Sequence, residues 1–177
     1  MADRSGGLVE SALRHAAPLL SGIVAVCIDV LPLPNPAPSS LAPFLTVCVV
    51  YFWTVYRPDL LSPWAVFALG LALDAVGGLP LGLTALALLL ARGVLLSSQR
   101  FLLTQPFVVI WACFVPMVLL VAALRWASAS LFWGRACPIQ PLLGEALLTL
   151  AAYPLVGWLL AGMQRRLAER VHATAGI

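Results

Sequence analysis

An aspartate lies in the middle of an apolar run in the stretch Gly70-Leu-Ala-Leu-Asp74-Ala-Val-Gly-Gly78-Leu-Pro-Leu-Gly82. Glycines precede Asp74 by four residues and follow it by four and by eight residues. A carboxylate in hydrocarbon is costly unless it finds a partner, so an acid within a membrane indicates a functional site. Glycines spaced by four residues allow a second backbone to approach closely. The stretch therefore predicts recognition or close packing inside a membrane.

The composition agrees with a membrane location. Of the 177 residues, 62% are hydrophobic and 10% are charged, and the mean hydropathy is +1.02, far from the values of soluble domains. Each spanning helix takes about 20 residues, which leaves no room for a separate soluble domain. We expect a single membrane domain over residues 17–164, between a cytoplasmic N-terminal segment (1–16) and a basic cytoplasmic tail (165–177). We expect no cleaved signal peptide.

Apolar runs bounded by proline, glycine and arginine predict an all-α protein with six transmembrane helices. These runs cover approximately residues 18–31, 41–56, 60–76, 79–96, 101–126 and 142–163. Five spans are possible if the third and fourth runs form a hairpin that does not cross fully. The second run closes with aromatic side chains, a composition typical of a membrane interface. These aromatic residues are Tyr51, Phe52, Trp53 and Tyr56.

The positive charges indicate the orientation. All ten basic residues are arginines, set against seven acids, and they cluster at the ends of the apolar runs. With six spans and the N-terminus inside, only Arg125 and Arg135 lie on the outer side. This bias predicts that both termini are cytoplasmic, and the pattern fits membrane topology better than nucleic-acid binding.

Asp74 lies about 14 residues into the third run, which places it about 21 Å from the cytoplasmic side. Arg125 lies at a comparable depth in the fifth run. We expect Asp74 to pair with Arg125 or to cap a neighbouring backbone, and so to fix a surface that receives a partner helix. The alternative is an internal polar contact that only sets helix packing. For Gly70 and Gly82 we expect close packing, and for Gly78 a tight turn.

The sequence also predicts local roles for other residues. Pro106, Pro116 and Pro154 lie in apolar runs and should kink helices there. Glu145 stands near the start of the sixth run, where an acid caps a helix favourably. Asp29 lies near an interface, where we expect it only to stay hydrated. The four cysteines and two histidines show no metal-ligand spacing, so we expect neither a metal nor a cofactor.

Several of these features together resemble the MreD family of rod shape-determining proteins. The resemblance rests on a proline-rich exit from the first helix, an aromatic second helix before a proline, the glycine and aspartate pattern, and an aromatic-proline step before a basic tail. In this sequence they are Leu31-Pro-Leu-Pro34, Tyr51 to Pro58, Gly70/Asp74/Gly78/Gly82, Tyr153-Pro154 and Gln164-Arg-Arg166.

The resemblance implies a non-enzymatic scaffold of the bacterial cell-elongation complex in the inner membrane. Its implied partners are the bitopic protein MreC and, through MreC, the MreB filament and the elongation-specific peptidoglycan synthases, besides membrane lipid. It also implies the six-helix fold of the substrate-capture subunits of energy-coupling-factor transporters, although a shared fold does not carry function across.

Two other functions compete with the scaffold role. A capture subunit for a small molecule such as a vitamin fits the size and the helix count, but such a site needs several convergent polar groups. The predicted outer segments offer mainly proline and apolar residues. An intramembrane hydrolase would need a nucleophile and a base, or metal ligands, at helical spacing, and Asp74 has no such companion in the sequence.

Overall fold

The computed structural model describes residues 3–31, 43–77, 80–134 and 139–175. Within this part of the chain it contains six α-helices and no strand. The helices are α1 (Asp3–Val30), α2 (Leu45–Tyr56), α3 (Pro63–Gly77), α4 (Leu83–Leu102), α5 (Phe107–Trp133) and α6 (Gln140–Ala175). Each predicted apolar run corresponds to one helix, and the third and fourth runs are two separate helices.

The helices differ in whether their length suffices to cross a bilayer. Three are long and apolar enough, over Leu83–Leu102, Phe107–Phe132 and Gln140–Arg165. The other apolar segments are shorter: Ala16–Val30, Leu45–Tyr56 and Pro63–Val76. A complete crossing by all six helices therefore stays a prediction.

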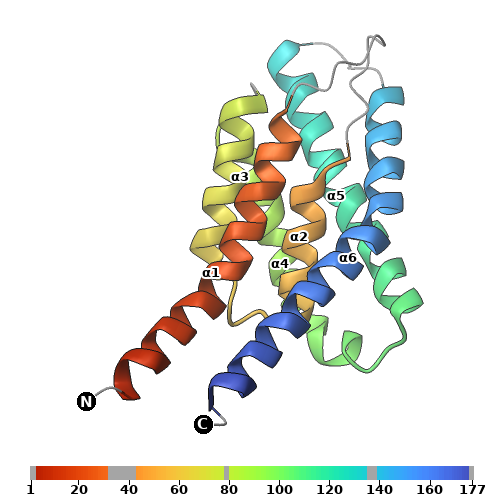
Figure 1. Ribbon diagram of the computed structural model, residues 1–177. Helices are drawn as coiled ribbons and strands as arrows, with labels where there is room; N and C mark the ends of the chain where they lie inside the picture. The colour runs from red at the N-terminus through yellow and green to blue at the C-terminus, as the bar shows by residue number, and fades with distance from the viewer. Residues whose placement is uncertain (1–2, 32–42, 78–79, 135–138, 176–177) are drawn as a thin grey trace.

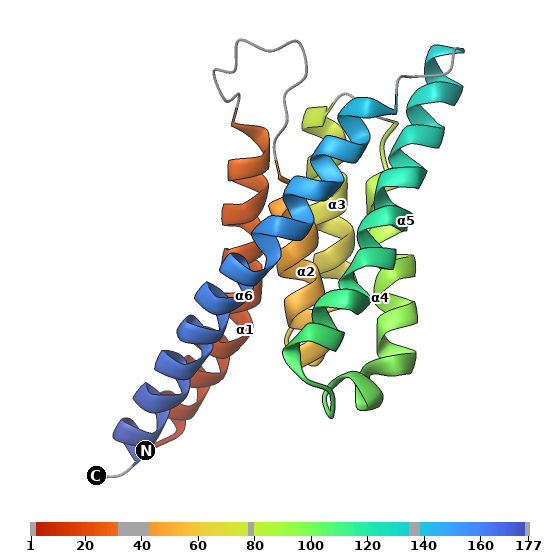
Figure 2. The same cartoon turned by 90° about the vertical axis from the view of Figure 1, so that its right-hand side faces the viewer.

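The bundle is built around α2. Helices α1, α4 and α6 pack directly on α2, and the outer helices form an arc in which α1 packs on α3, α3 on α4, α4 on α5 and α5 on α6. Figures 1 and 2 both show α2 in the middle of the bundle. All residues from Thr46 to Val55 are buried. With 12 residues α2 is about 18 Å long, so its ends fall short of a hydrocarbon core of about 30 Å.

The aromatic residues of α2 form the core of the bundle. Tyr51, Phe52 and Trp53 are at most 3% exposed, and only Tyr56 is partly exposed. The first three therefore lie inside the bundle, while a location at the depth of the membrane interface stays a prediction. The reason is tertiary: a helix enclosed by its neighbours buries aromatic rings that on a peripheral helix would reach the headgroups.

The aromatic donors of this core join the helices. The Trp53 indole donates to Ser21 Oγ on α1 at 2.9 Å, and the Tyr51 hydroxyl donates to the Ile110 carbonyl on α5 at 2.7 Å. The Tyr51 and Tyr153 rings meet edge to face, with centroids 5.4 Å apart. Because a buried polar group needs a partner, these bonds help to fix the register of α2 against α1 and α5.

The two ends of the bundle differ in which chain termini, connections and arginines they contain. Both termini lie at one end, with the α2–α3 and α4–α5 connections (Figures 1 and 2). We call this the proximal end, and the opposite end, where α1, α3 and α5 finish and α2, α4 and α6 begin, the distal end. Arg57 and Arg100 are exposed towards the proximal end, and Arg125 belongs to the distal half of α5. Arg135 lies outside the described residues.

Helices α3 and α4 meet at Gly70. A Cβ added at this position would lie 2.7 Å from the backbone nitrogen of Ala85 and 2.9 Å from its Cβ. Gly82, in contrast, has open space around it but a φ of +95°, so the turn into α4 and not close packing requires glycine there. The expectation of close packing at Gly82 is therefore wrong. Gly78, predicted to form the turn, lies outside the described residues.

We predict that Gly70→Ala lowers the thermal midpoint of the purified protein in detergent, with a destabilisation of about 2 kcal/mol, because the new methyl group would push α4 away from α3. Gly93→Ala on α4 is the matched control, since a Cβ at Gly93 meets no atom within 4 Å. The control should be neutral or slightly stabilising. Equal midpoints for the two variants would contradict the close contact.

Candidate functional site

Asp74 caps the N-terminus of α4. Its carboxylate accepts a hydrogen bond from the backbone N–H of Gly82 at 2.9 Å and from that of Thr84 at 3.0 Å. The side chain is completely buried. Asp74 lies one turn before the end of α3, and the positive end of the α4 dipole compensates its charge. The carboxylate therefore has its partners within the same helical hairpin.

This geometry decides between the two contacts expected for Asp74. Pairing with Arg125 is wrong, because Asp74 binds backbone groups of α4 and Arg125 binds a different acid on α6. The other expected contact is the one observed, because Asp74 caps the backbone at the start of α4. The physical reason is proximity, since the short connection between α3 and α4 brings two free N–H groups to the carboxylate.

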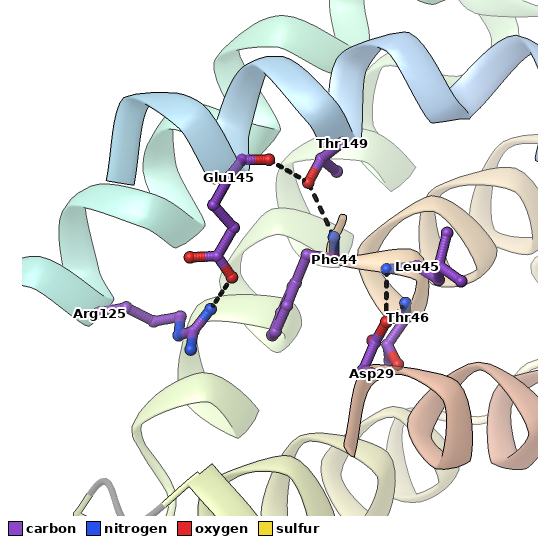
Figure 3. A network of polar contacts seen from close by, with 7 residues as sticks. All are labelled: Asp29, Phe44, Leu45, Thr46, Arg125, Glu145 and Thr149. Atoms are coloured by element: carbon purple, nitrogen blue, oxygen red, sulfur yellow. Dashed lines mark hydrogen bonds and ion pairs between the residues drawn. The ribbon is translucent and has the colours of Figure 1, made fainter. Parts of the chain in front are cut away.

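Asp29 repeats this arrangement between α1 and α2. Its two carboxylate oxygens accept from the backbone N–H groups of Leu45 at 2.8 Å and Thr46 at 2.9 Å (Figure 3). The expectation that Asp29 only stays hydrated is therefore wrong. A signal was present in the sequence: as at Asp74, an acid near the end of an apolar helix precedes a break and a new apolar helix.

The start of α2 is also bound by α6. The backbone N–H of Phe44 donates to Thr149 Oγ1 at 2.9 Å, and the Thr149 hydroxyl donates to the Glu145 carbonyl at 2.7 Å. Together with Asp29, Thr149 satisfies three consecutive backbone donors at the start of α2. No single residue type in the sequence marks Thr149 for this role, which only the packing of α6 on α2 reveals.

An ion pair joins α5 and α6 beside this helix start. Arg125 Nη1 lies 2.7 Å from Glu145 Oε1, with 23% and 28% of the two side chains exposed. The Arg125 guanidinium also lies 4.4 Å from the centroid of the Phe44 ring, and Figure 3 shows ring, guanidinium and carboxylate together. The expected capping role of Glu145 is wrong, because α6 begins at Gln140 and the Glu145 side chain faces Arg125.

We call these residues the distal network, since they connect α1, α2, α5 and α6. Its members are Asp29, Phe44, Leu45, Thr46, Arg125, Glu145 and Thr149. Beside the ion pair is a small hollow of about 20 Å³, lined by Arg125, Glu145 and Thr149 together with Phe44 and apolar side chains of α2, α5 and α6. A hollow of this size holds about one water molecule.

The three prolines expected to bend helices do not share one role. Pro106 is the N-cap of α5 and lies before the helix, so the expectation of a kink there is wrong. Pro116 and Pro154 lie inside α5 and α6. Figure 1 shows that α6 changes direction about halfway along. Pro154 has no N–H to offer the Leu150 carbonyl, and the Trp111 indole donates to that carbonyl at 3.0 Å.

We predict that Asp29→Ala and Asp74→Ala each destabilise the protein by about 3 kcal/mol, because each leaves two backbone donors without their acceptor in an apolar environment. Asp29→Asn and Asp74→Asn should cost less, since one acceptor oxygen remains. Thermal midpoints in detergent measure the effect. Asp59→Ala, in an exposed loop, is the control and should change little; a loss as large in the control would argue against the caps.

A double-mutant cycle should detect the ion pair. We predict that Arg125→Gln and Glu145→Gln are coupled by about 1 kcal/mol in unfolding free energy, because the two partly buried charges are in direct contact. Combining Glu145→Gln with Arg100→Gln, whose arginine lies towards the proximal end, should give additive losses. Additivity for the Arg125 and Glu145 pair as well would contradict a stabilising contact.

The chain was compared with known proteins. No curated protein and no solved structure gives a significant match, so the likeness to transporter capture subunits stays an expectation. The family model described as rod shape-determining protein MreD matches residues 12–161. Because this match covers most of the chain, and the apolar helices agree with a membrane protein, the chain belongs to the MreD family of rod shape-determining membrane proteins.

Proposed function

We propose that this protein is a non-enzymatic scaffold of the cell-elongation complex in the bacterial inner membrane. The single observation that carries the proposal is the match to the MreD family over residues 12–161. In this role the protein binds MreC and, through MreC, acts with MreB and the elongation-specific peptidoglycan synthases. It helps to organise the synthesis of lateral-wall peptidoglycan and so maintains the rod shape.

The orientation that we propose is multi-pass, with both termini and the proximal end in the cytoplasm. The support is the distribution of arginines, since Arg57 and Arg100 are exposed towards the end of the bundle that holds the termini. Positively charged residues are retained on the cytoplasmic side of a membrane. The distal network then lies in the outer half of the bilayer.

The contacts of the charged residues favour a partner that enters the membrane as an apolar helix. Asp29, Asp74, Arg125 and Glu145 all bind groups of this same chain. Large apolar side chains cover the outer faces instead, for example Trp158 at 76% exposure and Leu155 at 67%. A bitopic protein such as MreC offers a matching apolar surface, since helices in membranes associate largely through close packing.

We propose that Asp74, Gly70, Gly82 and Arg125 serve this function indirectly. They hold the α3–α4 hairpin and the outer halves of α5 and α6 in one arrangement, so that the lipid-facing side chains form a constant surface. The alternative of a small-molecule capture subunit receives less support from the distal network. Its hollow holds about one water molecule, whereas pockets for drug-sized ligands are far larger.

Depletion of the protein in its native cell tests the scaffold. We expect rods to become round while growth on complete medium continues for several generations, and a wild-type copy should restore the rod shape. Normal shape together with a new vitamin requirement would support the capture subunit instead.

A second experiment tests whether Asp74 affects MreC binding only through the stability of the bundle. Tagged wild-type protein, Asp74→Asn, Asp74→Ala and Asp59→Ala should be purified from mild detergent, and the recovered MreC should be divided by the amount of tagged protein. We expect Asp74→Ala to lower protein level and MreC recovery together, and Asp59→Ala to lower neither. Loss of MreC at an unchanged level and thermal midpoint of the Asp74 variants would mean that the carboxylate contacts the partner directly.

A further inference from the structure

Side chains of α4 hold the proximal end of α2 and the connection that follows it. Gln99 Nε2 donates to the Val55 carbonyl at 3.1 Å, in the last turn of α2. Arg92 Nη2 donates to the Leu61 carbonyl at 2.9 Å and contacts the Pro58 carbonyl at 3.4 Å. The α2–α3 connection is therefore fixed along the proximal half of α4.

These contacts bring two exposed arginines into one region. Arg57 follows Val55 by two residues, and Arg100 follows Gln99 directly, so the hydrogen bond between Gln99 and Val55 joins the two stretches of chain that carry these arginines. Neither guanidinium forms an ion pair or a hydrogen bond with the residues that the structure describes. Within the described residues 57–77 and 80–102, the exposed Asp59 is the one acid near this end, so the local charge is positive.

An apolar lane begins beside this pair of arginines. Leu90, Val94 and Phe101 lie on one face of α4, because spacings of four and seven residues return to the same side of a helix. Their exposures are 51%, 65% and 62%. Trp64, at the start of α3 and three residues from the Leu61 carbonyl that Arg92 binds, is 80% exposed. Tryptophan at this depth is typical of the headgroup region.

We propose that Arg57 and Arg100 form a binding site for the phosphate of an anionic phospholipid such as phosphatidylglycerol. The guanidinium groups bind the phosphate oxygens, for which their planar donors are well matched. The lane of Leu90, Val94 and Phe101 lies against the acyl chain. A lipid fits both parts of this surface, since a soluble phosphate compound would leave the lane without an occupant.

The inference rests on the proposed placement of the proximal end at the headgroup layer and is independent of the scaffold role. Arg92 has a different function in this site: its bonds to the carbonyls of Leu61 and Pro58 position the connection that carries Arg57. Arg165, exposed on α6, provides a matched control, since it has the same charge near the same end but belongs to another helix.

Native mass spectrometry of the purified full-length protein tests the site. The protein is incubated with mixed micelles of detergent, phosphatidylglycerol and phosphatidylcholine, and each retained lipid is counted. We expect Arg57→Gln with Arg100→Gln to lower the affinity for phosphatidylglycerol about ten-fold. Phosphatidylcholine retention should not change. Arg165→Gln should behave as the wild type, and Arg57→Lys with Arg100→Lys should retain part of the affinity.

Three results would overturn the proposal. One is an equal loss in Arg165→Gln, which would indicate only the general positive charge of this end. Another is an equal loss of both lipids, which would indicate apolar adsorption. The third is unchanged retention in the double variant. Thermal midpoints of all variants serve as the folding control, and because the assay does not involve cell shape, its failure leaves the scaffold function standing.

Discussion

The need to satisfy backbone groups at helix ends is the constraint on which this structure depends. In an apolar environment a free N–H or carbonyl has no water to bind, so neighbouring segments must supply hydrogen-bond partners to a helix that ends there. Asp29 and Thr149 supply them at the start of α2, and Asp74 at the start of α4. Gln99 and Arg92 supply them at the other end of α2 and in the connection after it.

This constraint explains how a small number of polar side chains can satisfy the backbone groups at the helix ends. Helix α2 is too short to reach both membrane surfaces, and it is enclosed by α1, α4 and α6. Each neighbour contributes one polar side chain to an end of α2, while aromatic donors such as Trp53 bind within the core. The hydrogen bond missing at Pro154 is replaced in the same way, because the Trp111 indole donates to the Leu150 carbonyl that proline leaves free.

The use of the charged groups inside the bundle also has a consequence for function. A charged group that caps a helix or forms an internal ion pair is not available to a partner, so the outer surface of the bundle is left to apolar side chains. In a member of the MreD family, such a surface fits our proposal of a scaffold that meets other proteins within the bilayer. The exposed arginines near the proximal end fit a second contact, with the phosphate groups of lipid.

The sequence by itself determined the six helices, because long apolar runs broken by proline and glycine permit little else. It also identified the family and the importance of Asp74. It did not identify the partner of Asp74, the roles of Asp29 and Thr149, or the burial of Tyr51 and Trp53. Only the tertiary structure decided these, because hydropathy reports that a helix is apolar but not whether lipid or another helix covers it. Which backbone donors remain free at a helix start, and which acceptor reaches them, depends on how residues distant in the chain pack together.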